Sequence, residues 1–433
     1  MSGRRVQPST SRSPGARRRA SSTPLVHLLL SLSRRRAEGQ ALQGALACAV
    51  HHLHLARRAT LTTRRAVDTR PGVERDLTPV FAELVRQRFG AAASVTRVAP
   101  LAGDASTRRY VRLWLTGPGV PASAVAMILA DRGIALSSEE LAVFTTAPTE
   151  LPYLNVHRFL AGLGVAIPAL YGDAAEHGVL LLEDIGDTAL WDAVQQQSDA
   201  RVLELYRAAI DQLLLIQVGG TRRADAHCIA FQQAFDERLF LWEFEHFIEY
   251  GIERRLATAI PAVDLEVMRR HFGAIARRLG AEPRYLNHRD YHSWNLYVQG
   301  GAVRVIDFQD ALLAPAPYDL ATLLGDRDTP HVIRPDLETQ LLAHYREGWA
   351  AMGEAPLDPA SFEDAYFLCA LQKALKVVGR FYFLDIEKKK PGYLRYIPST
   401  VRQIRRILPR FPDLEALAGI LHRYLPVEAA CAQ

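Results

Sequence analysis

Residues 285–310 decide the fold of this chain and read YLNHRDYHSWNLYVQGGAVRVIDFQD. Within this stretch, Asn295 follows Asp290 by five positions, and Asp307 comes after two short apolar runs. The runs are LYV and VRVI, and the residues between them, QGGA, are typical of a β-hairpin turn. We therefore expect a hairpin that returns Asp307 to the side of Asn295.

The order and spacing of these polar residues match a catalytic loop for phosphoryl transfer, in which HRD is followed by Asn and then by Asp-Phe. In such a loop, Asp290 would orient an acceptor hydroxyl and take up its proton. Asn295 and Asp307 would hold Mg²⁺ against the phosphates of a nucleotide, because Mg²⁺ prefers oxygen ligands. A lone HRD tripeptide or a strand that ends in Asp-Phe is not specific. The combination across a hairpin is specific.

The composition indicates a globular chain of two or three domains, with 433 residues of which 49% are hydrophobic. The formal charge of +5 is unevenly distributed. Residues 1–75 contain 15 arginines and 3 acidic residues, a net charge of +12, and the remainder carries 37 basic and 44 acidic residues, a net charge of −7. The body therefore has no basic surplus that would favour nucleic acid as a partner.

Two further features concern the compartment. No stretch of about 18 apolar residues occurs, so the sequence predicts no membrane-spanning helix. The four cysteines have no C-x-x-C spacing, which argues against a zinc site or a disulfide framework and fits the reducing cytoplasm.

Residues 1–74 form a basic extension that we expect to be disordered, since its first part is rich in Ser, Arg and Pro. A signal peptide is one alternative, but Arg34, Arg35 and Arg36 follow the first apolar run where small cleavage-site residues belong. The arginine-rich, acid-poor composition also resembles an organellar transit peptide. An extension that is not part of the folded domain is the interpretation we favour.

Residues 75–186 are expected to form a small lobe. A helix is predicted at 77–89, and strands are predicted at 95–101, 108–115 and 124–130. The turn Gly103-Asp104-Ala105-Ser106 between the first two strands is a candidate for backbone contact with a phosphate. A last apolar strand, from Val179, ends in an acidic turn that is either a plain core connection or the linker to a second lobe.

A lysine that would pair with nucleotide phosphates is missing from the strand at 124–130, because all five lysines lie at Lys373 or beyond. Arginine is also a competent phosphate ligand. Three arginines near the turn are candidate replacements, namely Arg108, Arg109 and Arg112. The loop backbone together with Mg²⁺ is the other option. Three glutamates are candidate partners for the arginine, namely Glu139, Glu140 and Glu150.

Residues 187–425 are predicted to be mainly helical, followed by a short tail at 426–433. Apolar residues recur at helical spacing in 202–218 and 365–383. Asp319 lies near the start of a predicted helix. It is either a favourable N-terminal charge or a brace that accepts backbone N–H groups of the catalytic loop.

Five stretches carry a resemblance to a known superfamily: LAGDASTRRYVRL, LLLEDIGD, LNHRDYHSWNLYV, VIDFQDALLAPAPYDLATLL and ALKVVGRFYFLD. Over residues 75–425 the chain resembles the aminoglycoside phosphotransferase/choline kinase superfamily. Within it, the pairing of GDAS-x-RRY with HRDYHSxNL and IDFQDA is most similar to bacterial sugar kinases of cell-wall recycling. Those kinases phosphorylate N-acetylmuramate and N-acetylglucosamine at C1.

The resemblance implies an α+β, two-lobed protein-kinase-like fold, with a small β-containing N-lobe, a mainly helical C-lobe and ATP in the cleft between them. It implies that Asp290 is the catalytic base and that Asn295 and Asp307 are magnesium ligands. His288 is expected to brace the loop. The implied nucleotide-binding residues are Gly103, Asp104, Ala105, Ser106, Arg109, Glu183 and Ile185.

The implied acceptor is a small-molecule sugar held by the C-lobe, with neither nucleic acid nor a membrane as a partner. Candidate acceptor contacts are His292, Asp310 and Arg380, and Trp294 is a further one. Core packing explains Trp294 and Arg380 equally well. Arg380 would suit the lactyl carboxylate of N-acetylmuramate, because Arg–carboxylate pairs are specific.

Two other functions are open at the level of sequence. An aminoglycoside or other small-alcohol phosphotransferase would fit the motifs, but no dense carboxylate cluster for a polycationic drug flanks the catalytic loop. A nucleotide-binding pseudokinase is motivated by the missing lysine, but Asp290, Asn295 and Asp307 are all present. A cytoplasmic sugar kinase that uses ATP and Mg²⁺ is the function that we expect.

Overall fold

The computed structural model describes residues 76–101, 108–129 and 148–425. The described residues from Leu77 onward belong to one compact unit. The basic extension, the turn Gly103–Ser106 and the two glutamates Glu139 and Glu140 lie outside the described residues. No helix within the described ranges is long and apolar enough to cross a membrane.

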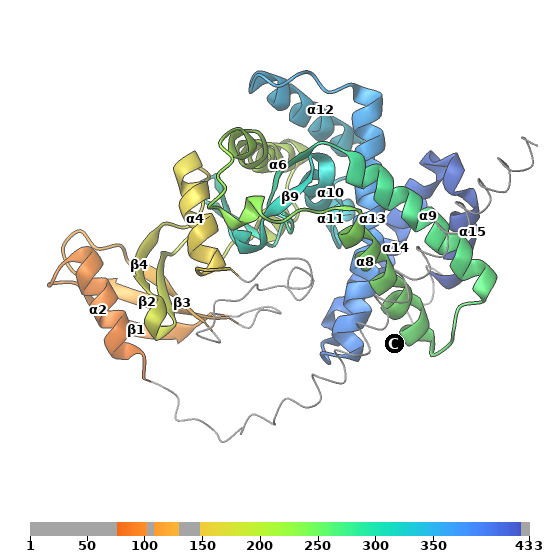
Figure 1. Ribbon diagram of the computed structural model, residues 1–433. Coiled ribbons are helices and arrows are strands. Elements are labelled where there is room, and N and C mark those ends of the chain that lie inside the picture. Colours follow the sequence, from red (N-terminus) through yellow and green to blue (C-terminus); the bar gives the residue numbers. More distant parts are fainter. Residues whose placement is uncertain (1–75, 102–107, 130–147, 426–433) are drawn as a thin grey trace, which may run out of the picture. The chain divides into compact units, whose positions relative to one another are not determined.

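The N-terminal part is a five-stranded antiparallel sheet in the order β1-β2-β3-β5-β4 (Figure 1). Its strands are β1 (Ser94–Pro100), β2 (Arg109–Thr116), β3 (Ser123–Ile128), β4 (Leu170–Ala174) and β5 (Val179–Glu183). The three strands predicted at 95–101, 108–115 and 124–130 are confirmed to within a few residues. The short strand β4 was not predicted, because LYGDA lacks a run of apolar or β-branched residues.

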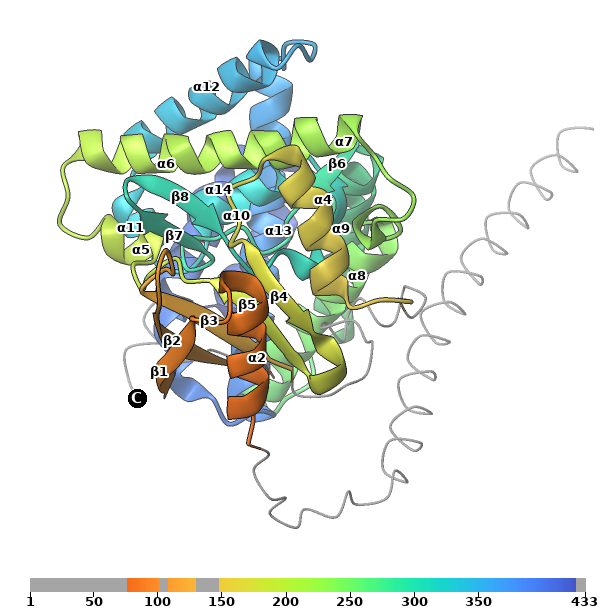
Figure 2. The same cartoon turned by 90° about the vertical axis from the view of Figure 1, so that its left-hand side faces the viewer.

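Helix α2 (Thr78–Phe89) covers one face of this sheet (Figure 2). It ends where Gly90 adopts a φ of 98° and its N–H donates to Arg86 O at 2.9 Å. Its buried face packs with Leu113, Leu115 and Leu181 of the sheet. Because side chains alternate along a strand, the neighbours of these residues face the other way, toward the helical C-terminal part.

The second face of the sheet joins the core of the C-terminal part. Met127, Leu180 and Leu182 belong to one hydrophobic cluster with residues of the helices that follow. Helix α4 (Pro152–Leu163), between β3 and β4 in the chain, contributes Tyr153 and Val156 to the same cluster. The sheet is therefore anchored to the helical part by apolar packing next to the predicted catalytic loop.

The C-terminal part is mainly helical, as predicted. Its α-helices are α5 (Leu190–Ala193), α6 (Asp199–Leu214), α7 (Gly220–Arg222), α8 (Glu237–His246), α9 (Ala262–Ala281), α10 (Pro317–Gly325), α11 (Thr329–Val332), α12 (Pro335–Ala351), α13 (Pro359–Ile386), α14 (Ile397–Ile407) and α15 (Glu415–Tyr424). Two π-helical turns, η2 (Leu215–Gly219) and η4 (Phe247–Arg254), continue α6 and α8. Short 3₁₀ turns are η1 (Ala175–His177), η3 (Ile229–Phe231), η5 (Phe308–Asp310), η6 (Pro391–Tyr396), η7 (Leu408–Arg410) and η8 (Pro412–Leu414).

Helix α13 is the 28-residue centre of this part and packs against η4, α10 and α14 (Figure 1). It begins where the Asp358 carboxylate accepts the N–H of Ser361 at 2.9 Å. Gly379 permits the close crossing with η4, since a Cβ atom there would lie 2.7 Å from Phe247 Cα. A larger residue at position 379 would push α13 away from its neighbours.

Two small antiparallel pairs complete the fold. Strand β6 (Arg284–Asn287) pairs with β9 (Leu312–Pro315), and β7 (Leu296–Gln299) pairs with β8 (Ala302–Val305). The second pair is the predicted hairpin, with a turn in which Gly300 and Gly301 take φ values of 58° and 88°. Both pairs lie immediately beside the catalytic loop in sequence.

Candidate active site

The hairpin brings the two predicted magnesium ligands together. Leu296 pairs with Val305 across it, and the N–H of Ile306 donates to Asn295 O at 3.0 Å. Asp307 is therefore the next residue after Ile306, whose backbone is hydrogen-bonded to that of Asn295. This backbone geometry is the one that the sequence predicts, and it brings the two residues close together in the fold.

Asn295 is oriented by its own amide. Its Nδ2 donates to Asp290 O at 3.0 Å, which leaves the carboxamide oxygen as the group that suits a cation. Among the described residues, no group of three or more His, Cys, Asp or Glu side chains is placed to hold a metal. A cation here would therefore depend on Asn295, Asp307 and phosphate oxygens, which is the usual manner of Mg²⁺ binding with a nucleotide.

Asp319 braces the catalytic loop. Its carboxylate, fully buried at the start of α10, accepts the N–H groups of His288 at 2.5 Å and Arg289 at 3.0 Å. Of the two roles considered for this residue, the brace is the one that the structure shows. Burial raises the pKa of Asp319 to about 6, although both backbone N–H groups and the charge of His288 act against this rise.

His288 has a structural position as well. Its ring Nε2 lies 2.8 Å from Ile306 O, so it ties the loop to the end of the hairpin. Two residues near this contact have left-handed backbones, with φ of 82° at Arg289, which precedes Asp290, and 63° at Asp307, which follows Ile306. Such left-handed conformations cost about 1–3 kcal/mol in residues other than glycine and cluster at functional sites.

Lys373, from α13, contacts the predicted catalytic base. Its Nζ lies 3.1 Å from Asp290 Oδ1 and 3.2 Å from Arg289 O. The Lys373 side chain is only 5% exposed, whereas that of Asp290 is 36% exposed. Burial alone would raise the pKa of the Asp290 carboxyl, but the neighbouring charges, with Lys373 first among them, hold it well below its usual range.

Of the three candidate arginines, Arg108 is the one that contacts Asp307, a predicted magnesium ligand. Its Nη2 lies 3.7 Å from Asp307 Oδ1, and its side chain is 13% exposed. Burial opposes the charge of Arg108, but Tyr110, Asp307 and Asp310 outweigh it and raise the pKa of the guanidinium. The structure thus brings together the start of β2 and the far side of the hairpin.

Arg109 and Arg112 lie elsewhere. Arg109 is exposed, and strand alternation puts it on the α2 side of the sheet with Val111 and Leu113. Arg112 is engaged by two carboxylates, with Nε 2.6 Å from Asp184 Oδ2 and Nη1 2.7 Å from Asp187 Oδ2. A contact of Arg109 with the nucleotide, as predicted from the sequence, stays a prediction.

The linker after β5 is held by a network of ion pairs. Besides Arg112, the hydroxyl of Ser123 donates to Asp184 Oδ2 at 2.7 Å, and Gln299 Nε2 donates to Asp184 O at 3.2 Å. The side chain of Glu183 pairs with Arg304 at 2.5 Å and accepts the N–H of Ala169. The Glu183 carboxylate is thus a structural group.

The neighbouring Ile185 is buried. Contact of the Glu183 and Ile185 backbones with adenine stays a prediction.

Phe308, next to Asp307, is fully buried under α4. Its ring centroid lies 5.0 Å from that of Tyr153 and 6.0 Å from that of His157. This packing fixes the position of the hairpin end against the N-terminal part. Glu150 was a candidate partner for the arginine that would replace the missing lysine. It instead pairs with Arg158 at 2.9 Å.

The candidate acceptor contacts come from three elements of the structure: the catalytic loop, the turn η5 and helix α13. The pKa of His292 is lowered well below its usual value, by burial first and by the charge of Arg327 next, so its ring is neutral. Asp310 ends the turn η5 beside Asp307 and acts on Arg108 through its charge. Arg380, on α13, lies with its guanidinium 5.0 Å from the centroid of Phe383.

Trp294 is packed. Its ring is stacked on that of Trp191 at 4.8 Å, and the guanidinium of Arg327 lies 4.7 Å from its centroid. Tyr396 contacts it edge-on at 5.9 Å. Of the two explanations considered for Trp294, core packing is the one that the structure supports.

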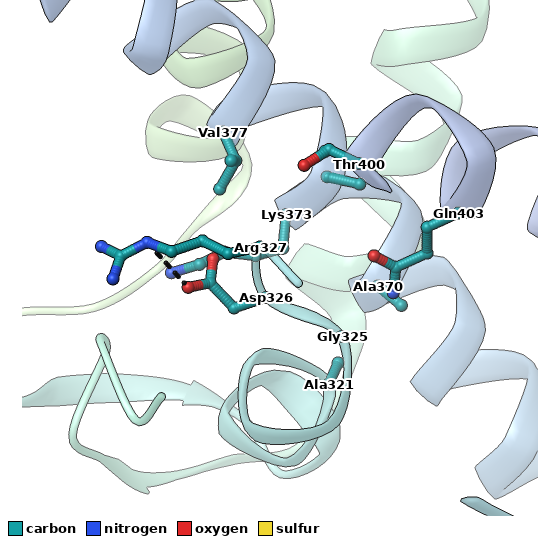
Figure 3. A pocket seen from close by; sticks show the side chains of 10 residues that line it. Ala321, Gly325, Asp326, Arg327, Ala370, Lys373, Val377, Thr400 and Gln403 are labelled. Carbon is teal, nitrogen blue, oxygen red and sulfur yellow. Dashed lines mark ion pairs between the residues drawn. The ribbon is translucent and has the colours of Figure 1, made fainter. Parts of the chain in front are cut away.

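Lys373 and Arg327 are the residues that sequence reasoning missed. Figure 3 shows Arg327 beside Asp326, with Nε 3.4 Å from Asp326 Oδ2, and Lys373 next to them. These residues border a cavity of about 10 Å³, room for about one water molecule, which Thr400 and Gln403 of α14 also line. A signal for Lys373 existed, because ALQKALK sets two of five lysines one turn apart in an otherwise apolar helix.

Two curated relatives bear the name N-acetylmuramate/N-acetylglucosamine kinase. The protein from Pseudomonas aeruginosa is 30% identical over 329 residues, which cover 74% of this chain and 87% of the relative. The protein from Caulobacter vibrioides is 29% identical over 348 residues, which cover 76% of this chain and 92% of the relative.

Two solved structures share the fold. The choline kinase from Cryptosporidium parvum superposes with a TM-score of 0.52 at 10% identity, over 81% of this chain and 99% of its own. The ethanolamine kinase from Plasmodium vivax does so with a TM-score of 0.50 at 13% identity, over 82% and 96%. They confirm the predicted kinase-like fold. Residues 97–355 match the model of the phosphotransferase enzyme family, and the chain belongs to that family.

Proposed function

We propose that this protein is a sugar kinase that transfers the γ-phosphoryl group of ATP to the C1 hydroxyl of N-acetylmuramate or N-acetylglucosamine. The observation that carries the proposal is the arrangement of Asp290, Asn295 and Asp307 around one hairpin, with the Asp290 carboxylate partly open to solvent. The names of the two relatives support the choice of acceptor.

In this proposal, bound ATP and Mg²⁺ supply the phosphoryl group and the positive charge that neutralises it. Asn295 and Asp307 hold the cation through their side-chain oxygens. Arg108, which lies 3.7 Å from Asp307, faces the phosphates in place of the missing lysine. The turn Gly103–Ser106 and the backbone at Glu183 and Ile185 complete the nucleotide site.

Asp290 orients the acceptor hydroxyl and accepts its proton. Its ion pair with Lys373 makes it a weak base. A sugar C1 hydroxyl is more acidic than an ordinary alcohol, because the ring oxygen withdraws electron density from the hemiacetal carbon. A weak base that mainly orients the hydroxyl therefore suits this acceptor, since the transition state of phosphoryl transfer is loose.

His292, Asp310 and Arg380 are proposed acceptor contacts. His292 is the most direct of them, because it lies two residues from Asp290 and its Nε2 is 3.5 Å from Asn295 Nδ2. We place the reaction in the cytoplasm, where ATP is available, and in the recycling of cell-wall sugars.

The test is ADP release with ATP and Mg²⁺ over a panel of acceptors: N-acetylmuramate, N-acetylglucosamine, kanamycin, choline and no acceptor. We expect turnover with the two acetylated sugars and a product that mild acid hydrolyses, as it does an anomeric phosphate. Asp290→Asn should abolish turnover and keep nucleotide binding, because it retains the shape of the side chain without the base.

Other outcomes would redirect the proposal. Turnover with kanamycin or choline alone would keep the phosphotransferase and reject the sugar. Nucleotide binding without turnover on any acceptor would favour a pseudokinase. An unchanged rate in Asp290→Asn would reject Asp290 as the base.

A further inference from the structure

We propose that Lys373 is a positioning residue that fixes the catalytic base from a distant helix. The inference rests on the proposed function in that it takes Asp290 as the base. One ammonium group makes two contacts with consecutive residues of the loop, 3.1 Å to Asp290 Oδ1 and 3.2 Å to Arg289 O. One oxygen of the carboxylate is thereby engaged, so Oδ2 is the oxygen left to meet the acceptor hydroxyl.

The contact with Arg289 explains how the loop keeps a strained backbone. Arg289 has a φ of 82°, a conformation that residues other than glycine hold only when the surroundings fix it. Its N–H donates to Asp319 at 3.0 Å, and its carbonyl accepts from Lys373. The backbone of Arg289 is thus held at its N–H by α10 and at its carbonyl by α13.

Lys373 is itself held in place. Its Nζ lies 5.2 Å from the ring centroid of Tyr318, and its side chain is buried where α13 faces the catalytic loop. The nearby buried carboxylate of Glu243 is engaged by Gln372 at 2.7 Å and by Lys376 at 3.7 Å. Lys376 thus contacts Glu243, and Lys373 is the lysine in direct contact with Asp290, although the charge of Lys376 also acts on Asp290.

A buried ion pair of purely structural value is the competing explanation, since such pairs are common and do not by themselves indicate catalysis. The two explanations predict different kinetics. A positioning role affects kcat through Asp290 alone, whereas a structural role lowers the amount of folded enzyme. Lys376 gives a matched control, because it lies one turn along α13, is 12% exposed and is paired with a carboxylate outside the loop.

The experiment measures kcat and KM for ATP and for the sugar in Lys373→Met, Lys373→Arg and Lys376→Met, with the folded fraction of each from thermal unfolding. We expect Lys373→Met to lower kcat about 100-fold, since a misplacement of about 1 Å has that effect. KM for ATP should change less than about 2-fold, since the variant leaves the nucleotide ligands intact. Lys373→Arg, which keeps the charge and the donors, should recover most of kcat.

The inference is overturned if Lys373→Met keeps kcat per folded molecule within about 3-fold of the wild type. It is equally overturned if Lys376→Met loses as much kcat per folded molecule.

The outcome is separable from that of the proposed function. Should the wild type phosphorylate neither acetylated sugar, the proposed function fails. The same variants are then compared by their slow ADP release without acceptor, in which Asp290 orients a water molecule. A loss in Lys373→Met, and none in Lys376→Met, would still support Lys373 as the positioning residue, and equal rates would reject it.

Discussion

Arg108 Nη2 and Asp307 Oδ1 lie 3.7 Å apart, so the first residue of the described range 108–129 contacts the far side of the catalytic hairpin. The arginine is nearly buried and shares a hydrogen bond with the phenol of Tyr110. A positive charge beside a magnesium ligand suits the phosphates of a nucleotide. We propose that Arg108, the residue just before β2, takes the place of a lysine on β3.

The first prediction concerns this replacement. Arg108→Met should raise KM for ATP about 10-fold and lower kcat about 100-fold, because it removes charge from the place where phosphate charge develops. Arg108→Lys should recover part of both. Steady-state kinetics with ATP as the varied substrate measure the effect.

Arg109→Met is the matched control. Arg109 is adjacent in sequence but exposed on the α2 side of the sheet, so we expect KM for ATP to change less than about 2-fold. A larger effect from Arg109→Met than from Arg108→Met would show that the sequence analysis, which named Arg109, identified the better residue.

The hairpin could be predicted because its information is local. The residue types of LYV-QGGA-VRVI determine the turn, and the turn determines that Asp307 returns to Asn295. The choice among three arginines was different. It depended on which sheet face each side chain takes and on which far segment covers that face, and neither can be read from the residues around Arg108.

The second prediction tests the magnesium ligands. Asn295→Ala and Asp307→Ala should each raise the Mg²⁺ concentration needed for half-maximal rate, and Asp307→Ala more so, because it removes a charged ligand. A titration of the initial rate with Mg²⁺ at saturating ATP measures this. Gln299→Ala, on the same hairpin but bonded to the linker at Asp184 O, should leave the Mg²⁺ requirement unchanged. Equal requirements in all three variants would reject the assignment.

The third prediction concerns Asp319. Asp319→Ala leaves the buried N–H groups of His288 and Arg289 without an acceptor, at about 1–3 kcal/mol each. We expect the free energy of unfolding to fall by about 2–6 kcal/mol by denaturant titration. Thr322→Ala, at one turn's distance on α10, removes only a helix-internal hydroxyl bond and should cost about 1 kcal/mol.

The pH dependence of Asp319→Asn gives the fourth prediction. The folded-state pKa of Asp319 is raised to about 6, so its protonated form is favoured by folding and this stabilisation is lost as pH rises through 6. The asparagine does not titrate. The loss of stability caused by Asp319→Asn should therefore be greater at pH 5 than at pH 8, by about 1.4 kcal/mol. A difference of the opposite sign would show that the carboxylate is the favoured form.

Lys373 shows where sequence reasoning stops. The pattern of α13 is predictable, and so is the helix itself. The face of α13 that meets the catalytic loop depends on the crossing with η4 at Gly379. It also depends on the π-helical turns, which change the register of the helices around it. An apolar periodicity shows that such a helix is buried, and it does not show which partner each buried lysine meets.

The last prediction concerns the choice between the two acetylated sugars, which differ by the lactyl carboxylate of N-acetylmuramate. Arg380 was predicted from the sequence for this group, and its guanidinium lies 5.0 Å from the ring centroid of Phe383. We propose Arg327 as a second candidate, because its guanidinium lies 4.7 Å from the ring centroid of Trp294, in the same loop as Asp290, and its charge acts on His292. Its φ of 51° is a further sign of a functional site.

Arg327→Met should therefore lower kcat/KM for N-acetylmuramate about 10- to 100-fold, the value of a charged hydrogen bond. The value for N-acetylglucosamine should change less than about 3-fold, because that sugar lacks the carboxylate. Arg380→Met serves as the matched comparison. The arginine that binds the carboxylate is the one whose loss lowers kcat/KM for N-acetylmuramate more than kcat/KM for N-acetylglucosamine. If both variants affect both sugars equally, neither arginine does so, and Arg327 instead serves only to hold Trp294, Tyr393 and Tyr396 together.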